Sequence, residues 1–123
     1  MVAAHQPPSP AAVVRAWSHA LNANDNEAAA ELFAQGARVI QPGVDARLTA
    51  ELALEFNASL PCGGKILHMT RTGNRVTAVF LLTERPKHRC DAPGGQAAAV
   101  FTISDRGLIV RWEQIPVPTK PTA

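Results

Sequence analysis

A chain of 123 residues that is 46% hydrophobic has the size of one ordinary domain and can bury a core of its own. Its 12 Lys and Arg residues face 10 Asp and Glu residues, which leaves a net charge of +2. The basic residues are scattered, so we expect no nucleic-acid partner. No apolar run is long enough to span a bilayer, and the opening letters MVAAHQPPSP lack the regions of a signal peptide. We therefore expect no membrane partner and a cytoplasmic protein.

The chain divides into one domain and two short tails. Residues 1–8 are rich in proline and are expected to form a mobile N-terminal tail, residues 9–116 form the domain, and residues 117–123 form a C-terminal tail. Ser9 followed by Pro10 is typical of a helix start. Apolar residues then recur at intervals of three and four, which predicts a helix with one buried face. These residues are Val13, Val14, Trp17, Ala20 and Leu21.

Two further helices are predicted. Asp25 can cap a second helix, which we expect to end at Gly36. Residues 37–41 read as a short strand, and a third helix is expected from the cap Thr49 to Leu60. The inner face of the second helix carries Ala28, Ala29, Leu32 and Phe33.

A β-hairpin follows the third helix. Segments 65–72 and 75–85 flank the dipeptide Gly-Asn, a turn that pairs Thr72 with Arg75. Both faces of this hairpin are substantially apolar, and helices can cover only one of them. We therefore predict a homodimer packed through the sheet.

Two strand patterns, QAAAVFTIS and LIVRWEQI, close the chain on either side of an Asp-Arg-Gly turn. Helices first and a sheet afterwards predict an α+β domain, with the helices on one face of an antiparallel sheet. The segment WSHALNANDNEAAAELFA and the final hairpin VFTISDRGLIVRWEQ resemble the nuclear-transport-factor-2-like superfamily and its SnoaL-like domains, over residues 11–115. The resemblance implies three N-terminal helices packed on a strongly curved antiparallel sheet, a cystatin-like cone. It also implies an apolar pocket for one small ligand.

The resemblance carries over few catalytic residues. On the ketosteroid isomerase pattern, Trp17 takes the place of a tyrosine, Gln41 that of the general-base aspartate and Ala99 that of the acid that donates to the oxyanion. None of the three can supply that acid–base chemistry, so we expect no steroid isomerisation by this mechanism.

The limonene-epoxide hydrolase pattern fits only in part. The stretch LTER places Arg85 on the arginine of that family's Asp-Arg-Asp triad, but the two aspartates fall on Lys87 and Gln114. Without them nothing activates water, and epoxide hydrolysis is not expected.

Arg85 and His68 fall on the same face of the predicted hairpin, the face that the resemblance directs into the cone. A buried arginine needs a partner. Arg85 would hold an anionic oxygen of a ligand while His68 donates or accepts a proton. Alternatively, Arg85 pairs with Glu84, Glu113 or Asp91, and backbone groups satisfy His68.

The other candidate pocket residues also have two interpretations. Gln41 and Gln114 either orient a polar ligand or hydrogen-bond each other. The aromatic residues either line an apolar chamber or form ordinary core. They are Trp17, Phe56, Phe101 and Trp112.

The two cysteines, Cys62 and Cys90, flank the central hairpin. The predicted register brings them near each other, so a disulfide is one possibility, although cytoplasmic proteins rarely keep one. His88 and Cys90 lack the third and fourth ligands of a zinc site. No metal and no cofactor are expected.

The sequence thus predicts a cone that binds a small, mostly apolar ligand with one polar or anionic group. Such a protein would act as a binder or as an enzyme of isomerisation, cyclisation or hydrolysis. The alternative is a non-catalytic dimerisation or regulatory module of the same fold. In that module the side chains of Trp17, Phe56 and Trp112 would fill the pocket.

Overall fold

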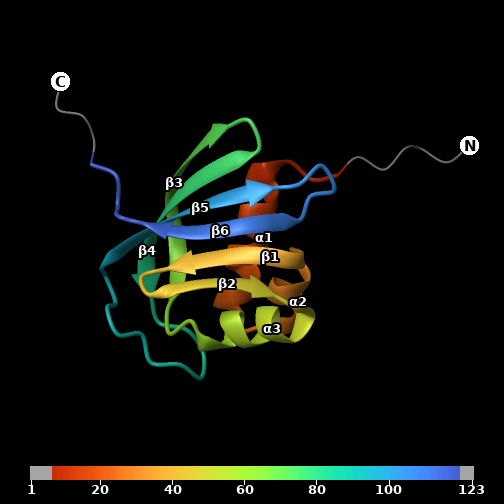
Figure 1. Ribbon diagram of the computed structural model, residues 1–123. Helices are drawn as coiled ribbons and strands as arrows, with labels where there is room; N and C mark the ends of the chain where they lie inside the picture. Colours follow the sequence, from red (N-terminus) through yellow and green to blue (C-terminus); the bar gives the residue numbers. More distant parts are fainter. Residues whose placement is uncertain (1–6, 120–123) are drawn as a thin grey trace, which may run out of the picture.

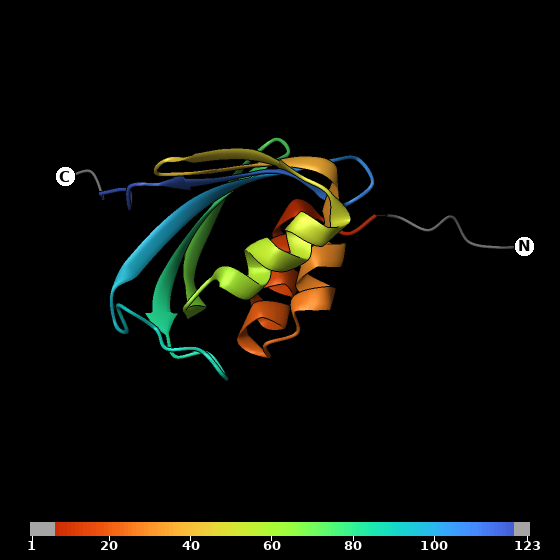
Figure 2. The same cartoon turned by 60° about the horizontal axis from the view of Figure 1, so that its bottom comes forward.

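Three helices lie against the concave face of one curved sheet in the computed structural model, which describes residues 7–119 (Figures 1 and 2). The predicted α+β class with a curved sheet is confirmed. Residues 1–6 of the expected N-terminal tail and residues 120–123 of the C-terminal tail lie outside the described part. The elements are α1 (Pro10–Asn22), α2 (Asn26–Glu31), β1 (Phe33–Gln41), β2 (Val44–Leu48), α3 (Ala50–Ser59), β3 (Gly63–Thr72), β4 (Arg75–Thr83), β5 (Gln96–Ile103) and β6 (Ile109–Ile115).

The three helices begin where the sequence predicts. Ser9, Asp25 and Thr49 each accept a hydrogen bond from the backbone N–H three residues further on, at 3.1 to 3.2 Å. All five apolar residues of the predicted inner face of α1 are buried, Trp17 among them. Within residues 7–119, no helix is long and apolar enough to cross a membrane.

The second helix is shorter than predicted. It ends at Glu31, and Phe33 already belongs to β1, where it pairs with Ile109 of β6. Gly36 does not end a helix. It has a φ of 78° inside β1, where the register with β6 shifts, and a positive φ at such a bulge favours glycine. Pairing with β6 therefore overrides the helical pattern of this segment.

The sheet has the order β2-β1-β6-β5-β4-β3. Neighbouring strands are antiparallel except β1 and β6, which are parallel, and β2 is a strand that the sequence pattern did not predict. Apolar side chains on the concave face pack against α1 and form the core. They include Val39, Val76, Ala78, Phe80, Ala99, Phe101 and Trp112.

The inner face of the β3–β4 hairpin is the opposite of the predicted one. The turn and its first pairs are as predicted, but the register shifts between Ile66 and His68. Phe80 pairs with Ile66 and packs on Trp17, with ring centroids 6.0 Å apart. The β4 residues on the same side as Phe80 therefore face the helices, instead of the predicted set. Arg75, Thr77 and the other β4 residues that alternate with Phe80 lie on the convex side, as does His68 opposite Val79.

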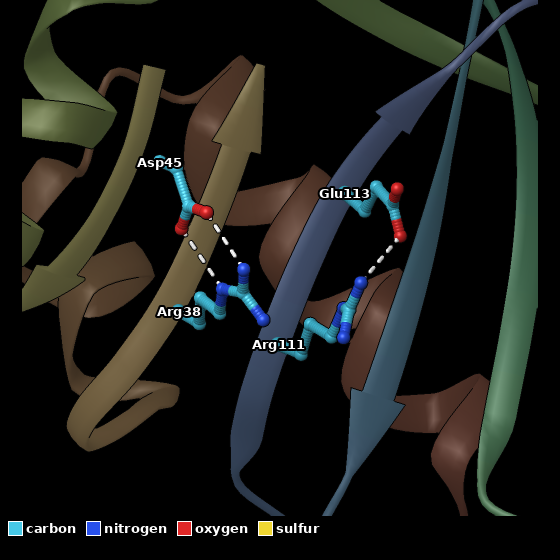
Figure 3. Close-up of polar contacts among 4 residues, drawn as sticks. All are labelled: Arg38, Asp45, Arg111 and Glu113. Carbon is cyan, nitrogen blue, oxygen red and sulfur yellow. Dashed lines mark hydrogen bonds and ion pairs between the residues drawn. The ribbon is translucent and has the colours of Figure 1, made fainter.

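The convex side of the sheet carries two ion pairs (Figure 3). Arg38 donates two hydrogen bonds to Asp45, at 2.8 and 2.6 Å, and Arg111 donates one to Glu113 at 3.0 Å. The hydrogen bond from Arg38 lowers the pKa of Asp45. All four side chains lie on the side of the sheet turned away from the helices.

Candidate functional site

A cavity of about 260 Å³ opens between α1 and the concave side of the sheet. Its volume is close to the lower end of the range of small-molecule sites, roughly 300–1,000 Å³. The polar atoms are few, so the cavity suits a small and mainly apolar molecule. The apolar part of its wall includes Trp17, Leu21, Leu60, Phe80, Leu82, Ala97, Ala99 and Trp112.

A second hollow of about 350 Å³ lies between α2, the start of α3 and the beginning of β1. Glu27, Glu31 and Gln35, all exposed, contribute to its lining. Its lining includes no buried polar side-chain atom that lacks a partner. The cavity beside α1 is therefore the better candidate for a ligand site.

Trp112, which lines this cavity, has a hydrogen-bond donor without a partner in the described part of the chain. Its side chain is only 6% exposed, and among residues 7–119 its Nε1 is the buried side-chain nitrogen or oxygen atom with no partner. Trp17 differs, because its Nε1 donates to Oδ1 of Asn57 at 2.8 Å. An unsatisfied buried donor costs about 1–3 kcal/mol. A ligand with an acceptor atom at Trp112 would remove that cost.

Two amides, one carboxylate and the hydroxyl group of Ser18 form the polar part of the cavity wall. Gln114 and Gln41 both line it, and the structure shows no hydrogen bond between them, contrary to one of the two interpretations of the sequence. Ala99 pairs with Gln114 across β5 and β6, and its small side chain leaves space in the cavity. Asp91, from the loop between β4 and β5, supplies the carboxylate.

Arg85 does not line the cavity. It is 2% exposed, and its guanidinium group joins the C-terminal ends of two helices. Nε donates to the carbonyl oxygen of Leu21 at 3.1 Å, and Nη1 donates to those of Asn57 and Leu60 at 2.8 and 2.6 Å. Nη2 donates to Oδ1 of Asn26. Leu21 and Asn57 also accept a backbone N–H at their helix ends, from Asn24 at 3.0 Å and Leu60 at 3.4 Å, so Arg85 adds a charged donor to carbonyl groups at two helix termini.

The electrostatic partners of Arg85 are helix ends. The predicted ion pair with Glu84, Glu113 or Asp91 is wrong, because carbonyl groups at two negative helix termini take its hydrogen bonds. Burial lowers the pKa of Arg85, but a guanidinium group remains protonated in proteins. Glu84 instead accepts a hydrogen bond from the backbone N–H of Cys90 at 3.2 Å.

His68 and Arg85 are therefore separated, and the predicted pair is wrong. His68 pairs with Val79 on the convex side of the hairpin, where it is exposed. Phe56 and Phe101 pack behind the cavity, with ring centroids 5.1 and 6.3 Å from that of Trp112. The predicted residues that do line one cavity are Trp17, Gln41, Ala99, Trp112 and Gln114.

Asp91 is a cavity residue that was not predicted from the sequence. It comes directly after Cys90, and Cys90 forms a disulfide with Cys62, with the sulfur atoms 2.08 Å apart. The disulfide considered from the sequence is thus present. Among residues 7–119, these three residues are the one cluster of potential metal ligands, but both sulfur atoms are already bonded to each other. The proximity of the cysteines was the signal that could have placed Asp91 at the cavity.

The model of the SnoaL-like domain matches residues 14–112. A search of curated proteins gives no match. These results agree with the resemblance seen in the helix pair and the final hairpin.

Several solved structures have the same fold. An NTF2-like protein of unknown function from Cytophaga hutchinsonii is 15% identical with a TM-score of 0.73, over 92% of this chain and 93% of that one. A cystatin-fold protein from Novosphingobium aromaticivorans is 18% identical with a TM-score of 0.70, over 89% and 99%. A protein from Catenulispora acidiphila with a ketosteroid isomerase-like fold, in complex with trimethylamine, is 19% identical with a TM-score of 0.64, over 89% and 87%. At these identities the similarity concerns the fold alone.

Proposed function

Because the chain belongs to the SnoaL-like domain family of the NTF2-like superfamily, we propose that it binds one small, mainly apolar molecule in the cavity beside α1. The observation that carries the proposal is the buried indole N–H of Trp112, which has no partner in the described part of the chain. A ligand in this cavity should therefore present a hydrogen-bond acceptor, such as a carbonyl or ether oxygen, to Trp112. The complex of the Catenulispora acidiphila protein with trimethylamine supports small-molecule binding within this fold.

Catalysis on such a ligand would need a proton donor or acceptor in the cavity. Ala99 and Gln41, which stand where ketosteroid isomerases have acids, cannot fill that role. Asp91 is the titratable side chain of the lining in the described residues, so an isomerisation, cyclisation or hydrolysis at this site would depend on it. Binding is the function that the geometry supports best.

The alternative function is a non-catalytic dimerisation or regulatory module. That hypothesis expects the side chains of Trp17, Phe56 and Trp112 to fill the pocket. A cavity of about 260 Å³ remains beside two of them, Trp17 and Trp112, which favours the ligand-binding function.

Trp112→Phe tests the proposal. The substitution removes no hydrogen bond of the indole group. We therefore expect the free energy of unfolding of the variant to lie within about 1.5 kcal/mol of that of the parent, as for conservative changes of core side chains. The chain has two tryptophans, so a nitrogen–proton NMR spectrum should show two indole signals, and the variant identifies that of Trp112. Acetophenone should shift this signal more than α-methylstyrene, which has a similar shape but no acceptor oxygen.

Trp17→Phe is the matched control. Its indole is already bonded to Asn57, so its signal should respond little to either compound, and the variant should lose more stability than Trp112→Phe. Equal shifts by acetophenone and α-methylstyrene at Trp112 would contradict the proposed acceptor contact.

The homodimer predicted from the sequence belongs to the same proposal. The convex side carries partly buried apolar residues such as Ile40, Leu81 and Val100 in addition to its ion pairs. A second copy packed on this side would cover them. We expect a dimeric mass by sedimentation equilibrium at micromolar concentration, and a monomeric mass for Val100→Lys. A monomeric mass for the parent would overturn the dimer.

The cytoplasmic location expected from the sequence stays a prediction. The disulfide between Cys62 and Cys90 argues against this location, because reducing compartments keep such cysteines as thiols. In a reducing cytoplasm we would expect the dithiol form of the protein.

A further inference from the structure

The charge in the lining of the cavity is negative. In the described part of the chain, Asp91 is the ionisable side chain of its lining, which includes no lysine, arginine or histidine. A ligand carboxylate or phosphate would meet no cation there and would approach the carboxylate of Asp91. The polar group of the ligand is therefore better matched by a positive charge than by the negative one considered from the sequence.

Two of the basic residues of this region, Arg85 and His88, make other contacts. All the hydrogen bonds of the Arg85 guanidinium group described above go to helix ends and to Asn26. His88 lies 3.0 Å from Oδ1 of Asn24 through its Nε2. Lys87 and Arg89, the other basic residues of the loop between β4 and β5, do not line the cavity.

The covalent structure of the loop holds Asp91 at the cavity. Its neighbour Cys90 is bonded to Cys62, which itself lines the cavity, and the Cys62 sulfur lies 3.5 Å from Oδ1 of Asp91. The hydrogen bond from the Cys90 N–H to Glu84 fixes the same segment a second time. Asp91 remains exposed on its outer side, which places it at the mouth rather than at the buried end with Trp112.

The walls of the same cavity include aromatic side chains. Trp17, Phe80 and Trp112 all contribute to the lining. Aromatic rings attract cations through their negative faces. Aromatic walls and one carboxylate are the combination that recognises an ammonium group on an apolar body.

We propose that Asp91, held in place by the Cys62–Cys90 disulfide, is a specificity-determining residue that makes the cavity select a protonated amine with an apolar body. This inference rests on the proposed function and adds the charge of the ligand to it. A neutral ligand of the same shape binds more weakly, and a carboxylate binds most weakly.

Three compounds with one apolar body test the inference: 2-phenylethylamine, 2-phenylethanol and phenylacetate. Each is titrated into the oxidised full-length protein at pH 7, and its dissociation constant is read from the amide and indole NMR signals. We expect the amine to bind about two- to fivefold more tightly than the alcohol, the size typical of an exposed ion pair. The preference should shrink as salt is added.

Asp91→Asn should remove the preference and bring the amine and the alcohol to equal affinity, with binding of the alcohol retained. Asp105→Asn is the matched control, because Asp105 is exposed in the turn before β6 and does not line the cavity. It should leave the preference of the parent unchanged. Reduction of the disulfide should weaken the preference as Asp91→Asn does, since the segment with Asp91 is then released.

The outcomes separate the two proposals. Equal affinities of the amine and the alcohol for the parent, or an unchanged preference in Asp91→Asn, overturn the role of Asp91 and leave ligand binding standing. Tighter binding of phenylacetate also overturns it. If none of the three compounds binds at millimolar concentration, and acetophenone does not bind either, both proposals fail.

Discussion

Replacing Arg85 with alanine should lower the free energy of unfolding by about 3–5 kcal/mol, the range for breaking a buried charged network. The change removes the charged donor that binds the carbonyl groups of Leu21, Asn57 and Leu60. Hydrogen bonds to a charged group are worth about 1.5–3 kcal/mol each. Urea unfolding followed by circular dichroism measures the effect.

Arg89→Ala is the control for this experiment. Arg89 lies in the same loop but is exposed, so its loss should change stability by less than about 0.5 kcal/mol. Arg85→Lys should recover only part of the stability, because one ammonium group cannot reach all the acceptors of the planar guanidinium group. An Arg85→Ala variant that unfolds like the parent but no longer binds acetophenone would contradict the structural role and restore the ligand-binding role considered from the sequence.

The role of Arg85 shows where prediction from the sequence ends. The sequence indicates that Arg85 is buried and needs a partner, and both points are right. Its partners, however, belong to the ends of α1 and α3, and Leu21 is 64 positions away in the chain. Strand alternation describes neighbours within a sheet and contains no information about helix termini that pack beyond its edge.

The prediction for His68 is wrong because the opposite face of the hairpin was taken as the inner one. The Gly-Asn turn sets the register correctly as far as His68, which pairs with Val79, and the extra residue of the bulge lies beyond it, between His68 and Ile66. No glycine or proline marks this bulge in the sequence. The choice of inner face was decided by packing, because Phe80 contacts Trp17 on the concave side.

Other features could be predicted because they depend on short segments. Helix caps need one side chain and the backbone a few residues away, and Ser9, Asp25 and Thr49 all act as predicted. The cavity wall contributed by β5 and β6 was also predictable, since alternation from Trp112 to Gln114 and the small Ala99 place these residues on one face. The mouth of the cavity was not, because a loop rather than a strand supplies Asp91.

The parts of the mouth are connected to one another. Arg85 joins the helix ends at the start of the loop between β4 and β5, and Cys90 ties the other half of the loop to Cys62. Asp91 lies directly after this second attachment. In this arrangement the loop is a fixed rim, although it contains no regular secondary structure.

Removing the disulfide should therefore have the second large effect. The Cys62→Ala/Cys90→Ala double variant should lose about 3.5 kcal/mol of unfolding free energy, from the loop-closure entropy of cysteines separated by 28 positions. Urea unfolding with and without a reductant measures this value. The reductant should destabilise the parent by a similar amount and leave the double variant unchanged, because the variant has no bond to reduce.

The double variant also separates the effect of the disulfide on the loop from the effect of Arg85. Arg85 is intact in it, so the ends of α1 and α3 keep their partner and the cavity should still bind acetophenone at Trp112. Asp91 loses its covalent anchor, so the preference for 2-phenylethylamine over 2-phenylethanol should fall. Thiol alkylation shows whether the reductant has fully reduced the parent. If it has, and the urea midpoint is the same with and without the reductant, the disulfide does not stabilise the fold. The anchoring of the rim would then depend on Arg85 and the Glu84 contact alone.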